Sequence, residues 1–263
     1  MITALLITLL AGLATSVGGL LATHKKVLDR PMLAASLAFA AGAMLFVSFV
    51  EILPLGLSTV GDNSSVMEWL VYGAFFVGIT VVLLIDRVLP KSLNPSELEG
   101  SEDRLTSKDT KVNKKLLRSG LLVALVLALH NFPEGMSTFL ASYQDLTVGI
   151  TLAVAIAIHN IPEGIAVAAP VYAATKSRKK AFWWATASGL AEPLGALVAV
   201  ALLQLFIPSE FMGVLFGFVA GMMVFVAIDE LLPAARRYQT DKHQVVYGLM
   251  TGFAVVALSL VLL

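Results

Sequence analysis

Long apolar stretches place the strongest limit on what this chain can fold into. Its 263 residues are 58% hydrophobic and only 14% charged, and the mean hydropathy is +0.86. A soluble domain has about a quarter of its residues charged. Inside a bilayer the backbone must satisfy its own hydrogen bonds, so apolar segments of about 20 residues cross it as helices. The sequence therefore predicts an all-α membrane protein.

Eight segments are long and apolar enough to cross a bilayer, and we treat residues 1–263 as a single transmembrane domain. The third connection, at about 90–117, is the only long polar one, and we expect it to be a mobile cytoplasmic linker. It contains no histidine, so it lacks the His-rich run of a metal-sensing loop. The spans are expected at about 1–23, 32–54, 68–89, 118–140, 146–170, 181–207, 211–233 and 243–263.

All 18 basic residues lie in alternate connections. With the third connection counted from about 86 to 118, the first, third, fifth and seventh connections hold 3, 8, 4 and 3 of them, whereas the second, fourth and sixth hold none. Because basic connections face the cytoplasm, this pattern predicts eight spans with both termini outside. The N-terminus has no basic residue ahead of its apolar run, so we interpret it as a first span rather than a cleaved signal peptide.

Internal repeats predict the arrangement of the spans. Two pairs of segments share nine of sixteen and six of eleven positions. Spans one to three resemble spans six to eight, and spans four and five resemble each other, in opposite orientations. Such a 3+2+3 inverted repeat is typical of transporters, which bind their substrate near mid-membrane. The matched segments are 39–54 with 218–233, 12–22 with 189–199, and the Tyr-Gly pairs at 72–73 and 247–248.

One polar cluster occurs twice inside apolar runs, as HNFPEG at 130–135 and as HNIPEG at 159–164. On a helix, the His and Glu of each copy are four residues apart and share a broad face with the Asn. The proline of each copy lacks an amide donor, which loosens the helix locally. We expect these two polar faces to point toward each other from the fourth and fifth spans.

A carboxylate at mid-membrane costs about 2.5–3.5 kcal/mol, so Glu134, Glu163 and Glu192 together cost roughly 8–10 kcal/mol if isolated. Histidine–glutamate hydrogen bonds that only join the helices are one explanation for this cluster. A divalent cation offsets the cost further, because it neutralises two carboxylates and uses imidazole and amide ligands. Ligands of this type without any cysteine suit Zn²⁺, Fe²⁺, Mn²⁺ or Co²⁺ better than Cu⁺. Bridging carboxylates allow two adjacent ions.

Several other residues are candidates for a role at this site. Glu192, in AEPLGA of the sixth span, aligns with Thr15 in the repeat, and we interpret this symmetry-breaking carboxylate as a ligand. Met44 either packs in the core or offers its thioether at the edge of the site. Acidic residues just before prolines are interpreted as solvated helix ends, with caps, interface charges or transient pathway ligands as alternatives: Glu51, Asp229 and Glu230.

With HNFPEG, HNIPEG and AEPLGA in these places, the whole chain resembles the ZIP (Zrt/Irt-like) metal transporters, most closely their bacterial ZupT- and GufA-like branch. The resemblance implies a transporter, not an enzyme, with no organic cofactor. It implies uptake of zinc into the cytoplasm through a binuclear site, with iron, cobalt, manganese and cadmium as further candidate cargo. It assigns one ion to His130, Glu134 and Glu163, with Met44 and His159 as extra ligands. It assigns the other ion to Asn131, Glu134, Asn160, Glu163 and Glu192.

Two other classes of function stay open at this stage. An intramembrane zinc-dependent hydrolase would hold one ion with an activated water, although no HExxH motif is present. A metal-sensing membrane protein would bind metal without flux. For a transporter we expect a multi-pass location in the cell (plasma or inner) membrane, divalent metal ions and lipid as partners, and no nucleic acid. Small residues in AAGAM and VAGMM pack within one chain or between two, and we expect a homodimer.

Overall fold

The computed structural model describes residues 1–24, 27, 29–60, 65–88, 124, 127–128, 131–204 and 209–262. Seven helices within these residues are long and apolar enough to cross a membrane, and the predicted all-α membrane fold is confirmed. The expected linker at 90–117 lies outside the described residues. The expected fourth span is described mainly over residues 131–144, which are helical.

The helices have the following bounds. They are α1 (Ile2–Leu21), α2 (Arg30–Val47), η2 (Ser48–Ile52), α3 (Leu53–Val60), α4 (Ser65–Val88), α6 (Leu146–Thr175), α7 (Arg178–Gly189), α8 (Ala191–Gln204), α9 (Ser209–Phe225), η4 (Val226–Leu231), α10 (Leu232–Tyr238) and α11 (Gln244–Leu262).

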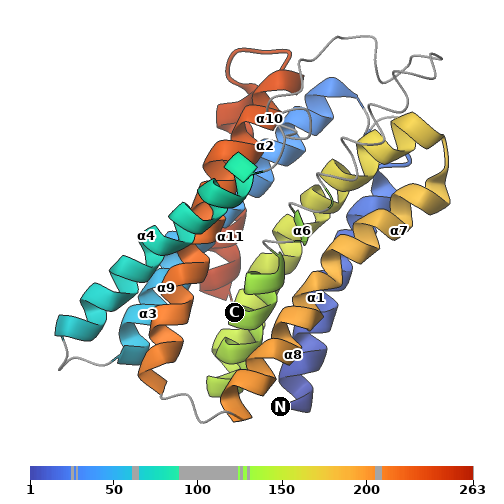
Figure 1. Ribbon diagram of the computed structural model, residues 1–263. Helices are drawn as coiled ribbons and strands as arrows, with labels where there is room; N and C mark the ends of the chain where they lie inside the picture. The colour runs from blue at the N-terminus through green and yellow to red at the C-terminus, as the bar shows by residue number, and fades with distance from the viewer. Residues whose placement is uncertain are drawn as a thin grey trace.

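Two bundles of helices lie side by side (Figure 1). The first contains α1, α6, α7, α8 and the 131–144 helix, and the second contains α2, α3, α4, α9, α10 and α11. The bundles meet where α2 and α11 pack against α6. Both marked termini lie toward the lower end of the view, whereas the starts of α2 and α7 lie at the upper end. The side of the membrane that each end faces stays a prediction.

Glycines bring the helices of the first bundle into backbone contact. A side chain at any of four glycines would overlap a carbonyl oxygen of the neighbouring helix, so these helices approach as closely as their backbones allow. The sequence repeat relates the first of the contacts given next to the second, and the third to the fourth. They are Gly18 with Ile161, Gly195 with Phe132, Gly164 with Thr15, and Gly135 with Glu192.

The second bundle contains the same kind of contact. The glycines of AAGAM and VAGMM pack against carbonyl oxygens of α11 and α4, so both motifs are used within one chain. The homodimer stays a prediction that these motifs no longer support. The contacts are Gly42 with Leu249, Gly221 with Phe75, Gly252 with Phe39, and Gly78 with Phe218.

These contacts correct one detail of the repeat. By these contacts, Gly78 corresponds to Gly252. The alignment of the Tyr-Gly pairs would instead place Gly252 opposite the residue before Gly78. A side chain on Gly73 would meet open space, whereas one on Gly248 would lie 2.7 Å from Ala38 Cβ. The Tyr-Gly match is therefore not a structural equivalence. The paired contacts favour an inverted repeat, which itself stays a prediction.

Two π-helical segments, η2 and η4, interrupt the second and seventh spans just before Pro54 and Pro233. Each proline lacks an amide donor, and a π-helical turn accommodates the loss of that hydrogen bond. Glu51 and Glu230 lie in these segments. Glu230 is only 8% exposed, so its interpretation as a solvated helix end is wrong.

We expect Gly18→Ala to destabilise the protein, because its Cβ would overlap the Ile161 backbone and such overpacking costs about 1–3 kcal/mol. Gly73→Ala is the matched control, since its Cβ meets open space and Ala is up to about 1 kcal/mol better than Gly in a helix. Thermal unfolding of the purified protein in detergent measures both. Equal Tm values for the two variants would contradict the close packing of α1 on α6.

Candidate metal centre

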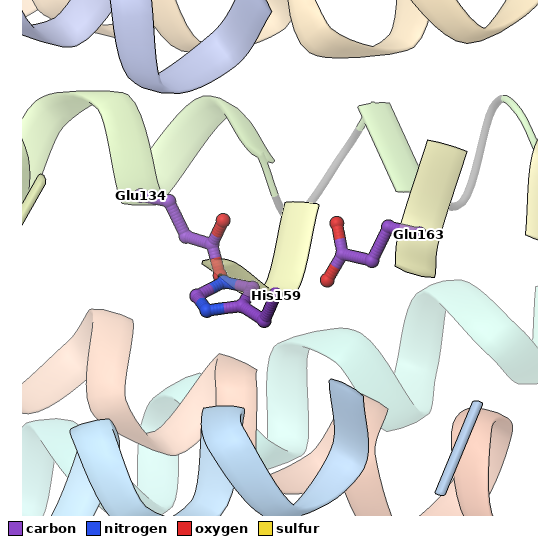
Figure 2. Close-up of side chains that lie close together, drawn as sticks. All are labelled: Glu134, His159 and Glu163. Atoms are coloured by element: carbon purple, nitrogen blue, oxygen red, sulfur yellow. The ribbon is translucent and has the colours of Figure 1, made fainter. Parts of the chain in front are cut away.

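Three chelating side chains meet between the 131–144 helix and α6. Figure 2 shows the carboxylates of Glu134 and Glu163 on either side of the His159 imidazole. One ligand atom from each of the three residues lies within 4.8 Å of the others, and all three residues are fully buried. Zinc–ligand distances of about 2.0–2.2 Å place tetrahedral ligand atoms about 3.4 Å apart. A small inward shift of these side chains would therefore enclose one ion.

Helix α6 places His159 and Glu163 on one face because it continues unbroken through the second motif. Asp145 caps its start by accepting hydrogen bonds from the amides of Thr147 and Val148. The helix runs through Pro162 and Pro170 and ends where Lys176 takes a left-handed conformation with φ of 54°. The residues at i and i+4 therefore lie one above the other.

The orientation of the His159 ring prepares it for a cation. Nδ1 lies 3.0 Å from the Ala155 carbonyl oxygen, which only accepts, so Nδ1 carries a proton. Nε2 lies 3.4 Å from Oε1 of Glu134. A neutral imidazole would then aim a lone pair at a carboxylate oxygen, and the two would repel. A proton on Nε2 or a metal ion between the two atoms removes this repulsion, and a backbone-bonded Nδ1 is common in metal-ligating histidines.

Both asparagines of the repeated motif are fixed by the same kind of hydrogen bond. Nδ2 of Asn160 donates to the Ala11 carbonyl at 3.0 Å, and Nδ2 of Asn131 donates to the Ser188 carbonyl at 3.3 Å. These bonds set which side of each amide is oxygen. Within the described chain, both Oδ1 atoms are buried without a hydrogen-bond partner, which leaves them free to bind a cation.

Glu192 joins this group from α8. Its Oε1 accepts a hydrogen bond from Nδ2 of Asn160, and its carboxyl carbon would lie 3.4 Å from a Cβ on Gly12. Because Glu192 lies in the first turn of α8, the positive end of the helix dipole favours its carboxylate. Oε2 of Glu192 and Oε2 of Glu134 are buried without a hydrogen-bond partner in the described residues.

Two further candidate ligands are placed differently. His130 lies outside the described residues, so its part in the site stays a prediction. Met44 is fully buried in α2, and α2 packs against α6. This agrees with core packing and leaves the thioether ligand as a prediction.

The centre combines acidity with complete burial. Glu134, Glu163 and Glu192 are all 0% exposed, and the buried polar residues of the described chain include no Lys or Arg. Ionised carboxylates in a low-dielectric interior need a compensating positive charge. Carboxylate, imidazole and amide oxygens together bind divalent cations such as zinc. A multi-pass membrane protein with such a centre belongs to the class that handles divalent cations.

Comparison with known proteins identifies the family. A family model described as "ZIP Zinc transporter" matches residues 89–260. The chain is 49% identical to "Zinc transporter ZupT" of Corynebacterium aurimucosum, over 97% of this chain and 95% of that protein. It is 47% identical to "Zinc transporter ZupT" of Oceanobacillus iheyensis, over 100% and 98% of the two chains. The chain belongs to the ZIP family, so it is an integral membrane transporter and not an enzyme.

The sequence did not predict the backbone groups that orient the ligands. The carbonyls of Ala11, Ala155 and Ser188 carry no side-chain signal, and their roles depend on how the helices cross. One weak signal was present for two of them. Ala11 and Ser188 directly precede the matched segments 12–22 and 189–199.

We expect Glu134→Gln to lose most of the zinc-dependent rise in Tm, because the substitution removes a carboxylate from the three-residue group. A ligand at 100 times its Kd stabilises a protein by about 2.7 kcal/mol. Without metal the variant should be at least as stable as the wild type, since it buries one charge fewer. Glu68→Gln, an exposed change in α4, is the control. A zinc response in Glu134→Gln equal to that of the wild type would contradict the assignment.

Proposed function

We propose that the chain carries zinc into the cytoplasm through a centre that holds two adjacent cations. The observation that carries this proposal is the buried meeting of Glu134, His159 and Glu163, with a second group of oxygen donors beside it. The relatives named as zinc transporters support zinc as the cargo. Iron, cobalt, manganese and cadmium are further candidate cargo, because the donor set contains nitrogen and oxygen but no thiolate.

The two cation positions share the glutamates of the repeated motif. Glu134, His159 and Glu163 serve the first ion, with His130 and Met44 as further ligands. The second ion lies toward Asn131, Asn160 and Glu192, with Glu134 and Glu163 bridging the two. Support for the second position comes from the buried oxygens that lack hydrogen-bond partners within the described chain: Oδ1 of Asn131, Oδ1 of Asn160, Oε2 of Glu134 and Oε2 of Glu192.

A cleft with several polar residues in its lining supports release toward the side with the basic turns. The cleft has a volume of about 530 Å³ and lies between α2, α11 and Pro162 of α6. Pro162 directly precedes Glu163, and the lining includes Ser36, Asp241 and Gln244. The connection before Gln244 is one of the basic ones, which the positive-inside rule assigns to the cytoplasm. The cleft thus extends from the residue before Glu163 toward the predicted cytoplasmic end.

The division into two bundles supports a carrier rather than a fixed pore. Every described candidate ligand except Met44 lies on the first bundle. Among the described glycines, each backbone overlap joins two helices of the same bundle, and none crosses between bundles. An interface without such interlocking rearranges more readily than the interior of either bundle. Relative movement of the bundles would then expose the ligands to the two sides in turn.

Zinc flux into proteoliposomes loaded with a fluorescent zinc indicator tests the proposal. We expect the wild-type rate to saturate as zinc is raised, as a carrier requires. The Glu134→Ala/Glu163→Ala double variant should fall to the rate of protein-free vesicles, because both bridging ligands are lost. Glu68→Ala should keep the wild-type rate. Zinc binding by the wild type without flux under any gradient would show a metal-sensing protein and overturn the proposal.

A further inference from the structure

The contacts around the two asparagines relate the two sides of the centre. Asn160 is held by the carbonyl before Gly12, and Asn131 by the carbonyl before Gly189. Gly12 and Gly189 are equivalent in the sequence repeat and lie against each other in the fold. Counting three residues on from each glycine leads to Thr15 on one side and Glu192 on the other. By this equivalence, Thr15 corresponds to Glu192, and the repeat relates Thr15 to Asn131 as it relates Glu192 to Asn160.

The Thr15 hydroxyl lacks the hydrogen bond that threonines usually make in helices. Thr8, Thr138 and Thr186 each donate to the carbonyl four residues earlier. For Thr15 that carbonyl is Ala11, which already accepts from the amide of Asn160. Oγ1 of Thr15 is fully buried and has no hydrogen-bond partner within the described chain. A buried hydroxyl without a hydrogen-bond partner is unfavourable, so its presence here points to a ligand.

The surroundings of Thr15 place this hydroxyl at the metal pathway. Oγ1 would lie 2.9 Å from a Cβ on Gly189, the residue after the Ser188 that holds Asn131. The carbonyl of Thr15 lies against Gly164, the neighbour of Glu163. Gly12 faces Glu192, and Thr15 is about one turn, or 5 Å, further along α1. By the predicted orientation, that direction leads toward the cytoplasm.

We propose that Thr15 and Asn131 form a neutral oxygen position for the transported cation, next to the acidic one at Glu192 and on its release side. The proposal rests on the proposed function of zinc transport. Two neutral oxygens bind a divalent cation more weakly than a carboxylate does, because affinity rises with the number of charged ligands. An ion that passes from Glu192 to Thr15 is therefore released more easily. Thr15 sets the rate of release while leaving capture to the carboxylates.

Three substitutions in the full-length protein test the role of the hydroxyl. Thr15→Ser keeps the hydroxyl, Thr15→Val removes it at nearly constant shape, and Thr15→Asp supplies the carboxylate that the repeat would place there. Zinc flux in proteoliposomes gives KM and the maximal rate, and a zinc titration of the purified protein gives Kd. Thr8→Val is the matched control, because Thr8 is an equally buried threonine of α1 that is bonded to Ala4.

We expect Thr15→Ser and Thr8→Val to retain the wild-type maximal rate. Thr15→Val should lower that rate about tenfold, the low end of the effect of losing a supporting group. Its Kd should change little, because the carboxylates capture the ion. Thr15→Asp should tighten zinc binding about tenfold and slow transport, because the added charge retains the ion. Wild-type flux in Thr15→Val, or an unchanged Kd in Thr15→Asp, would overturn the proposal.

Two further outcomes are also decisive. If Thr15→Val does not fold, the Kd of Thr15→Asp and the rate of Thr15→Ser decide the matter by the same criteria. If the wild type moves no zinc, the proposed function fails. The zinc titration then still tests Thr15, since an unchanged Kd in Thr15→Asp removes this residue from the cation site.

Discussion

Buried negative charge is the constraint on which this structure depends. Glu134, Glu163 and Glu192 are fully enclosed, and no buried Lys or Arg in the described chain balances them. In a lipid environment the missing positive charge must come from a proton or a guest cation. The imidazole of His159, held by a backbone carbonyl, and two amide oxygens complete a donor set for the guest. The apolar helices around the centre exclude water, which makes the binding of a cation by the carboxylates more favourable.

Glycine packing gives this donor set its geometry. The backbone of α8 at Glu192 lies directly on Gly135, and the carboxylate lies beside Gly12. A side chain at Gly135 would overlap the Glu192 backbone, and one at Gly12 would press against the Glu192 side chain, so either would displace the carboxylate. These candidate ligands come from three helices, the 131–144 helix, α6 and α8, but the backbones in contact leave little freedom between them. Glycine contacts of this kind lie within each bundle, and none of the described ones crosses between the bundles, which suits the proposed movement of one bundle against the other.

Hydropathy and charge were sufficient to predict the helical membrane fold, because a bilayer permits few alternatives. The repeated motif was sufficient to bring Glu134 and Glu163 together with His159, since residues four apart share a helix face. Register between helices was not predictable: the Tyr-Gly match misleads by one residue, because Gly73 faces open space and Gly248 a neighbouring helix. The carbonyls that orient the asparagines were equally hidden, since backbone groups leave no trace in residue type.

Asparagine fits the proposed centre better than aspartate would, because the proposed function requires the ion to be released. An aspartate cannot donate to the carbonyls of Ala11 and Ser188, whereas an amide donates to them and still presents an oxygen. Charge leads to the same conclusion. With Glu134, Glu163 and Glu192 ionised and His159 neutral, one divalent ion leaves the centre at a net charge of −1 and two leave it at +1. Two aspartates would shift both values by −2 and hold the ions far more tightly. For the two-ion centre proposed above, near-neutrality at either occupancy would let one ion arrive as another leaves.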